Sequence, residues 1–232
     1  MPKFLVHGWW NIGGAKMSKS LGNVIDPDLL AEKYGPEALR YYLMGDIGTG
    51  GDANFMLDRL ISRWNSDVAN SIGNLLNRSL SMIARYQQSR LKMPAGEWLH
   101  NPDQQPIERY SDRISGEVRS LRSHFSMARL LPITLPFTSG PYVINAGIAN
   151  IIEVSTQGNA LVDSTVPWKL AKGDSELAAV KLNAVLYALA ESLRIIAILI
   201  SPVLPRAAHG RAPGPDGPRF VEILAARPGG FS

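Results

Sequence analysis

Two long runs of apolar residues at helical spacing constrain the fold of this chain more than any other feature. In the first run apolar side chains recur every three or four residues along one side of a helix: Leu57, Leu60, Ile61, Trp64, Val68, Ile72, Leu75, Leu76, Ile83 and Tyr86. The second run, Ser175 to Ile200, is apolar on more than one face and stops before Pro202. Such a helix needs neighbours on several sides, so the sequence predicts a bundle with residues 175–200 in its middle.

The first part of the chain has a different pattern. Residues 4–12 are rich in aromatic and β-branched side chains and end at two glycines, which predicts a strand followed by a turn. The pair Asp26-Pro27 supplies a capping carboxylate and a proline suited to the first helical position. We therefore expect a short helix over residues 28–34, ended by Gly35, and a second helix that starts at residue 36.

Two stretches interrupt the helical pattern. Residues 130–152 contain prolines, glycines and amides and are expected to form an irregular insertion, and residues 211–232 contain four prolines and are expected to be a disordered tail. A further helix is expected at residues 107–121. The predicted fold class is mainly α, with a small α/β part over residues 1–55 followed by an antiparallel helical bundle over residues 56–210.

Composition excludes several kinds of chemistry. The chain has no cysteine, so it has no disulfides, thiolate zinc sites or cysteine nucleophiles, and its four histidines show no metal-ligand spacing. We therefore predict no metal site. The N-terminus lacks the apolar region of a signal peptide, which predicts a cytoplasmic location. The one long uncharged stretch, residues 130–152, contains too many helix breakers to suggest a membrane span. The net charge of +4 is too small to indicate a nucleic-acid partner by itself.

A short basic loop follows the predicted strand: Lys16, Met17, Ser18, Lys19 and Ser20. Two ammonium groups and two hydroxyls between glycines can close on phosphates, because a lysine supplies a mobile charge and glycines let the backbone move with it. The alternative is an ordinary solvated surface, which is what most short Lys/Ser runs are.

The loop and its surroundings resemble the methionyl-tRNA synthetases, which are class I aminoacyl-tRNA synthetases. The resemblance covers roughly three quarters of the chain and is carried by residues 7–27, 34–43, 51–55, 65–70, 73–78, 163–172 and 186–205. It implies a C-terminal portion of such an enzyme. Residues 1–55 would be the C-terminal edge of the catalytic domain with the mobile loop, and residues 56–210 would be the helical anticodon-binding domain.

The resemblance implies a role in methionine activation for the loop. Lys16, Met17, Ser18, Lys19 and Ser20 would bind ATP, with Mg²⁺ expected to accompany it. Lys19, and with it Lys16, would be catalytic, because an ammonium that engages the departing pyrophosphate mainly in the transition state lowers the barrier.

The resemblance also implies that Asn74, Arg78 and Trp168 contact the anticodon of tRNA-Met. Asn74 and Arg78 are four residues apart on one helical face beside the apolar stripe, free to reach a partner. An amide and a guanidinium can read base edges, and an exposed indole can stack on an unpaired base. The alternatives are a solvated helix face for Asn74 and Arg78 and a core indole for Trp168. For Trp9 and Trp10 we expect packing beneath the loop rather than ligand binding.

The family reaction is ATP-dependent activation of methionine followed by transfer to tRNA-Met. Neither the His-Ile-Gly-His-type motif nor the methionine pocket of the family occurs in residues 1–232. Methionine would therefore be bound through an N-terminal half outside this chain, and we expect the chain alone to retain tRNA binding without adenylation. Two alternatives are a stand-alone tRNA-binding module without catalysis and a purely structural helical domain.

Overall fold

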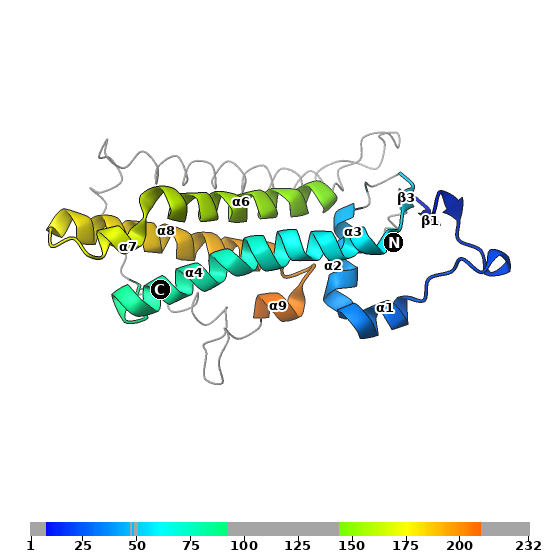
Figure 1. Cartoon of the computed structure of the whole chain (residues 1–232), viewed down its shortest axis with the longest axis horizontal. Coiled ribbons are helices and arrows are strands. Elements are labelled where there is room, and N and C mark those ends of the chain that lie inside the picture. Colours follow the sequence, from blue (N-terminus) through cyan, green and yellow to red (C-terminus); the bar gives the residue numbers. More distant parts are fainter. Residues whose placement is uncertain (1–7, 47, 49–50, 92–143, 210–232) are drawn as a thin grey trace, which may run out of the picture.

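The structure is a computed structural model that describes residues 8–46, 48, 51–91 and 144–209. Its long helices lie side by side along the longest axis, and a small sheet and two short helices lie at one end (Figure 1). The mainly α fold class is confirmed. The predicted helix at 107–121, the predicted tail at 211–232 and residues 130–143 of the predicted insertion lie outside the described residues.

A small sheet forms the start of the described chain. Its strands are β1 (Trp10–Ile12), β2 (Ala15–Lys16) and β3 (Ala53–Asn54), in the order β2-β1-β3. β1 pairs antiparallel with β2 and parallel with β3. The predicted strand and turn are thus confirmed where the structure describes them.

Two short helices follow as predicted. In α1 (Pro27–Tyr34) the Asp26 carboxylate accepts a hydrogen bond of 2.9 Å from the main-chain N–H of Asp28, which satisfies one of the unpaired groups at the helix start. Gly35, with φ of 88°, ends α1, and α2 (Pro36–Asp46) starts directly after it. These helices and the sheet enclose a small core of Ala38, Leu39, Tyr42 and Leu60.

The first long apolar run forms three consecutive helical segments: α3 (Leu57–Arg63), the π-helix η2 (Trp64–Gly73) and α4 (Asn74–Gln87). The predicted helix over residues 57–86 is confirmed. Sequence spacing did not indicate the π segment, because the apolar stripe continues through it. A π-helix is rare and often marks a functional position, and this one borders the polar contacts described below.

The second half of the bundle is formed by α6 (Ile144–Thr165), α7 (Pro167–Leu170), α8 (Glu176–Ile200) and α9 (Pro205–His209). The prediction of an irregular insertion is wrong for residues 144–152, which form the first turns of α6. Gly147, Ile148 and Ile151 are buried there. Burial of one face against the bundle outweighs the weak helix propensity of glycine and asparagine.

The contacts between the long helices give their directions. α4 and α6 run in the same direction, because Ser71 contacts Ser155 and Arg78 contacts Asp163, so both positions advance together. α8 runs in the opposite direction, since Gln87 at the end of α4 donates to Asn183 near the start of α8. Alternate helices of an antiparallel bundle run in the same direction, so these directions do not contradict the predicted antiparallel bundle.

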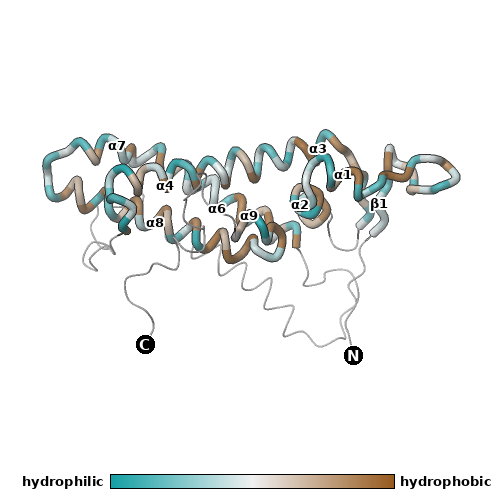
Figure 2. The backbone as a smooth tube through the Cα atoms, turned by 90° about the horizontal axis from the view of Figure 1, so that it is seen from below, coloured by the Kyte–Doolittle hydropathy of each residue, from teal (hydrophilic) through white to brown (hydrophobic). Residues whose placement is uncertain are grey.

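The core lies around α8, as the sequence predicts. α8 contacts α4, α6, α7 and α9, and Leu186, Leu189 and Leu193 are almost completely buried. Among the described helices it is also the one long and apolar enough to cross a membrane by length and composition. Its burial inside the bundle accounts for that composition. Along the other long helices hydrophobic and hydrophilic residues alternate around the axis (Figure 2).

Candidate functional site

The loop is presented by a tight hairpin. Gly13 and Gly14 have φ values of 59° and 80°, the left-handed region that a two-residue hairpin turn requires and glycine adopts without strain. The turn brings β2 back along β1, with Ile12 opposite Ala15 and Asn11 opposite Lys16. The hairpin therefore fixes the point at which the loop leaves the sheet.

The Asn23 side chain holds the two ends of the loop together. Its Oδ1 accepts a 2.8 Å hydrogen bond from the main-chain N–H of Ser18, and its Nδ2 donates to the carbonyl of Lys16 at 3.3 Å. The hydroxyls of Ser18 and Ser20 are 2.6 Å apart. The loop is thus a closed unit with its own hydrogen bonds, which the sequence did not reveal.

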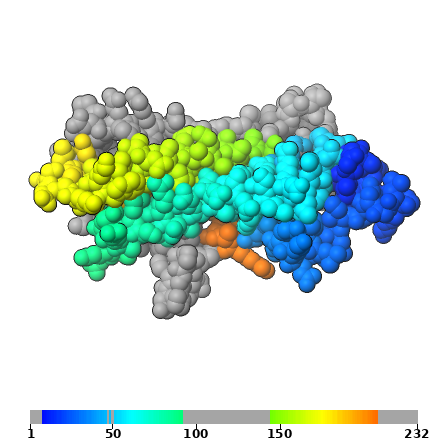
Figure 3. Space-filling model, viewed as in Figure 1, coloured from blue at the N-terminus to red at the C-terminus, as the bar shows by residue number. Residues whose placement is uncertain are grey.

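All five residues predicted to bind ATP lie on this one loop. Lys16, Lys19 and Ser20 are exposed, and Met17 and Ser18 are half-buried. Lys19 begins a short 3-10 helix (Lys19–Leu21), and no ion pair forms to it within the described residues. In the space-filling view the start of the described chain lies at one end of the molecule (Figure 3).

The two tryptophans before the loop have different surroundings. The Trp10 ring lies 5.8 Å from that of Tyr42 and 6.1 Å from that of Phe55, so the prediction of packing is confirmed for Trp10. Trp9 is 62% exposed, and the Lys16 ammonium lies 3.7 Å from the centroid of its indole. The expectation of packing beneath the loop is therefore wrong for Trp9, because alternate residues of a strand point to opposite faces.

A second group of polar residues connects the first long helix to α6. We call it the polar seam, and it consists of Ser71, Asn74, Arg78, Ser155, Asn159 and Asp163. The Ser71 and Ser155 hydroxyls are 2.8 Å apart. Asn74 Nδ2 donates to Asn159 Oδ1 at 3.2 Å, and Asn159 Nδ2 donates to the Ser71 carbonyl at 3.0 Å.

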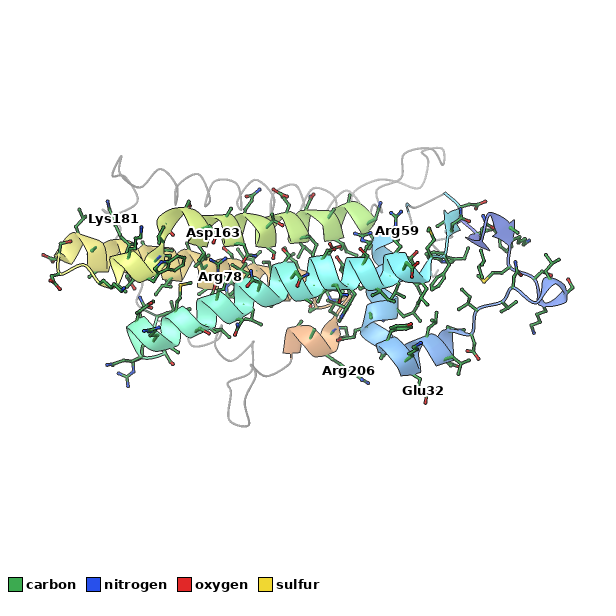
Figure 4. The ribbon with its side chains drawn as sticks, viewed as in Figure 1. Glu32, Arg59, Arg78, Asp163, Lys181 and Arg206 are labelled. Carbon is green, nitrogen blue, oxygen red and sulfur yellow. The ribbon has the colours of Figure 1, made fainter. Side chains whose placement is uncertain are left out.

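The seam continues to the end of α6 with an ion pair. Arg78 Nη2 and Asp163 Oδ1 are 2.6 Å apart, and the two side chains point toward each other from α4 and α6 (Figure 4). The side chain of Asp163 is 67% exposed, so the pair lies at the surface. Asn74 and Arg78 share one helix face as predicted, but in this structure both already have a partner.

Trp168 lies on α7, five residues after Asp163. It is 41% exposed, so it is not a core indole. No hydrogen bond or ring contact joins Trp168 to Asn74 or Arg78 among the described residues. The structure thus brings Asn74 and Arg78 together, with Trp168 on the helix that follows their seam partners. Sequence reasoning gave no role to Asn159 and Asp163, although the polar spacing of 155, 159 and 163 was a signal for a shared face.

A charged cluster joins α2 to the first long helix. Arg63 donates to Asp46 at 3.1 Å and to Asp67 at 3.3 Å, and Asp67 accepts a 2.9 Å hydrogen bond from the Tyr41 hydroxyl. Burial, together with the negative charge of Asp67, raises the pKa of Tyr41 well above its usual range. These residues link the two parts of the molecule, and spacing along the chain did not indicate their contact.

A cavity of about 570 Å³ lies away from the loop, between α1, α2 and α9. Glu37 lines it and accepts hydrogen bonds from the main-chain N–H groups of Arg206 and Ala207 at the start of α9. Within residues 8–91 and 144–209, as far as the structure describes them, no group of His, Asp and Glu side chains is arranged to hold a metal ion.

Comparison with known protein families is consistent with the arrangement of hairpin, basic loop and long helix described above. Residues 1–80 match the family described as tRNA synthetases class I (M). The hairpin, the basic loop and the first long helix as far as residue 80 all lie in the matched segment.

Relatives narrow the assignment. The chain is 38% identical over 211 residues to the methionine–tRNA ligase of Caldanaerobacter subterraneus subsp. tengcongensis, a match that covers 88% of this chain and 28% of the relative. It is 38% identical over 209 residues to that of Rickettsia bellii, covering 90% and 37%. Most of the chain is thus similar to methionyl-tRNA synthetases, and it spans about a third of the length of these relatives.

Solved structures show the same fold. A methionyl-tRNA synthetase of Mycobacterium tuberculosis in complex with methionyl-adenylate superimposes with a TM-score of 0.73 and 30% identity. The match covers 95% of this chain and 39% of the other. The apo form of the enzyme from the same organism gives a TM-score of 0.69.

Proposed function

We propose that this chain supplies the phosphate-binding loop and the anticodon-reading helices of a methionyl-tRNA synthetase. The observation that carries the proposal is the occurrence, in one chain similar to these enzymes, of an exposed two-lysine loop and a polar helix seam. The loop residues would bind ATP, accompanied by Mg²⁺, and the seam with Trp168 would bind tRNA-Met. A cytoplasmic location remains part of this proposal.

The loop can contact phosphate, but it does not form a complete catalytic site by itself. Lys16 and Lys19 both lie at the surface, and neither lines the cavity between α1, α2 and α9. A catalytic site that loads charge onto pyrophosphate needs oriented substrates and exclusion of water. Methionine would be bound by the part of the relatives that this chain does not span, and we expect the chain alone not to form methionyl-adenylate.

Methionine-dependent exchange of pyrophosphate into ATP tests this expectation. The purified chain should give a rate equal to that of a blank without protein. Exchange that depends on methionine and is lost in Lys19→Met would contradict the expectation and would make the chain a complete catalyst.

The seam is proposed to read the anticodon. Arg78 would exchange its partner Asp163 for a base edge, which is feasible because an exposed ion pair contributes only about 0–1 kcal/mol. A good base contact contributes about 1–3 kcal/mol of discrimination, and a stacked base contributes a similar amount on an exposed indole such as Trp168. The free energy gained from the base contacts therefore exceeds the free energy lost with the Arg78–Asp163 ion pair.

A gel shift with tRNA-Met and with a tRNA altered only in its anticodon tests the seam. Arg78→Met should reduce the preference for the tRNA-Met anticodon by about tenfold or more. Arg85→Met is the matched control, since it removes the same charge from the same helix at an exposed position. Equal losses in the two variants would mean that Arg78 contributes only nonspecific phosphate attraction.

A stand-alone tRNA-binding module without catalysis is the second candidate. The bundle favours it, because its core is formed almost entirely by the long helices and α9, separately from the small core beneath the loop. The two candidates differ in the loop. A pure tRNA-binding module would not bind tripolyphosphate, and its Lys16→Met and Lys19→Met variants would bind tRNA-Met like the unaltered chain.

A further inference from the structure

The two lysines of the loop are held differently. Lys19 has no ion pair among the described residues, whereas the Lys16 ammonium lies over the indole of Trp9, 3.7 Å from its centroid. The ring carries negative charge density on its face, which attracts a cation. One lysine of the pair therefore has an aromatic contact, and no ion pair or ring contact joins the other among the described residues.

The register of the hairpin explains how this contact forms. Lys16 lies opposite Asn11, so the two side chains lie on one face of the sheet. Trp9 precedes Asn11 by two residues and therefore shares that face. Trp9 and Lys16 are diagonal neighbours across the hairpin, a separation that long and aromatic side chains can bridge. The contact thus follows from the hairpin itself.

The main chain of Trp9 is anchored on both sides. Its N–H donates to Asp52 Oδ1 at 2.7 Å, and its carbonyl accepts from the N–H of Ala53 at 2.9 Å. The indole is exposed while its backbone is tied to the segment at β3. An exposed ring on a fixed backbone provides a platform for a cation, and sequence reasoning had assigned Trp9 only a packing role.

We infer that Trp9 is the positioning residue for Lys16. Its indole holds the Lys16 ammonium at the start of the loop, where the ammonium can contact phosphate. The inference rests on the proposed phosphate function of the loop. An ammonium has three N–H donors, and contact with the ring on one side leaves donors on the other side for phosphate oxygens. Lys16 would therefore be preorganised, and Lys19 would move to the ligand.

The contact can be measured without any ligand. Reductive methylation with isotope-labelled formaldehyde converts each lysine to a dimethyl-lysine that keeps its charge, and Lys16→Arg identifies the Lys16 signal by NMR. Methyl groups above the face of an indole are shielded, so this signal should lie upfield of the other lysine signals. Trp9→Ala should abolish the shift, Trp9→Phe should restore part of it, and the Lys19 signal should not change in either variant.

The inference is overturned if the Lys16 signal coincides with those of the exposed lysines, or if Trp9→Ala leaves it unchanged. Circular dichroism of each variant verifies that the fold is retained. Trp9→Phe keeps an aromatic ring at this position, so a recovered shift identifies the ring face, and not a structural role of Trp9, as the cause.

Binding of inorganic tripolyphosphate tests the consequence for phosphate. Trp9→Ala should weaken binding about two- to fivefold, the range for an exposed cation–π contact. In the Lys16→Met background Trp9→Ala should have no effect, because Trp9 acts through Lys16. Equal weakening in both backgrounds overturns the inference. If the unaltered chain binds no tripolyphosphate, the proposed phosphate function fails, and a Trp9-dependent Lys16 signal still supports the positioning of Lys16.

Discussion

The loop end and the helical bundle differ in how far their large apolar side chains are exposed. At the loop end many large apolar residues are exposed: Trp9, Leu21, Val24, Leu29 and Met56. In the bundle most large apolar residues lie in one continuous core around α8. The bundle is therefore stabilised mainly by its own interior, whereas the loop end has a core of only four buried residues and presents apolar surface that the described residues do not cover.

α2 belongs to both regions. Two consecutive residues of this helix point into different cores, since Tyr41 lies in the core of the bundle and Tyr42 in the small core beneath the sheet. The ion pairs of Arg63 lie at the same junction. The loop end is therefore attached to the bundle through α2, the start of the first long helix and a charged cluster, and this attachment can be tested.

The largest effect is expected in the core of the bundle. Leu189→Ala should lower the free energy of unfolding by about 2–5 kcal/mol, because it leaves a cavity at a completely buried position on α8. Leu29→Ala, at a position that is 64% exposed on α1, is the control and should change stability by less than about 0.5 kcal/mol. Urea unfolding followed by circular dichroism measures both. Similar losses of unfolding free energy in the two variants would contradict the conclusion that the buried core of the bundle contributes more to stability than the exposed apolar surface of the loop end.

The junction should give an intermediate effect. Arg63→Met removes a donor from Asp46, whose side chain is only 6% exposed, and from the carbonyl of Gly45. We expect a loss of about 1–3 kcal/mol in the free energy of unfolding, since the Gly45 carbonyl loses its side-chain donor and Asp46 keeps only the exposed Arg59 as a partner. Arg59→Met removes a mostly exposed partner of the same Asp46 oxygen and should cost at most about 1 kcal/mol. If Arg59→Met costs as much as Arg63→Met, the burial of Arg63 is not what matters at the junction.

The smallest effect concerns Tyr41 and pH. Burial beside Asp67 raises the pKa of Tyr41, so the folded chain holds the phenol proton more tightly than the unfolded chain. Its contribution to stability is present below the unfolded pKa of about 10 and is lost as pH rises above it. The urea midpoint should therefore fall above about pH 10.

Tyr41→Phe sharpens this test. It should cost about 1 kcal/mol at neutral pH through the lost hydrogen bond to Asp67, and the decline at alkaline pH should become shallower. Tyr34→Phe on α1, outside the cluster, should keep the decline of the unaltered chain. An unchanged decline in Tyr41→Phe would show that Tyr41 does not couple the junction to pH.

Much of the fold could be predicted from local chemistry. The cap at Asp26, the break at Gly35 and the periodicity of the two long helices are encoded within a few residues of each position, and all appear as expected. The failure at residues 144–152 has the opposite cause. Its glycines and amides indicate a loop locally, but burial of Ile148 and Ile151 against the bundle favours a helix.

The candidate site shows the same division between features that the local sequence predicts and features that tertiary contacts decide. The sequence by itself determined which residues carry charge, hydroxyls and amides, and it placed Lys16 to Ser20 on one loop and Asn74 and Arg78 on one helix face. Only the tertiary structure decided their partners. Asp163 for Arg78, Asn159 for Asn74 and the direction of α6 depend on contacts between distant residues, and the position of Trp9 beside Lys16 depends on strand register. Spacing along a chain fixes the face of an element, whereas packing between elements fixes what that face meets.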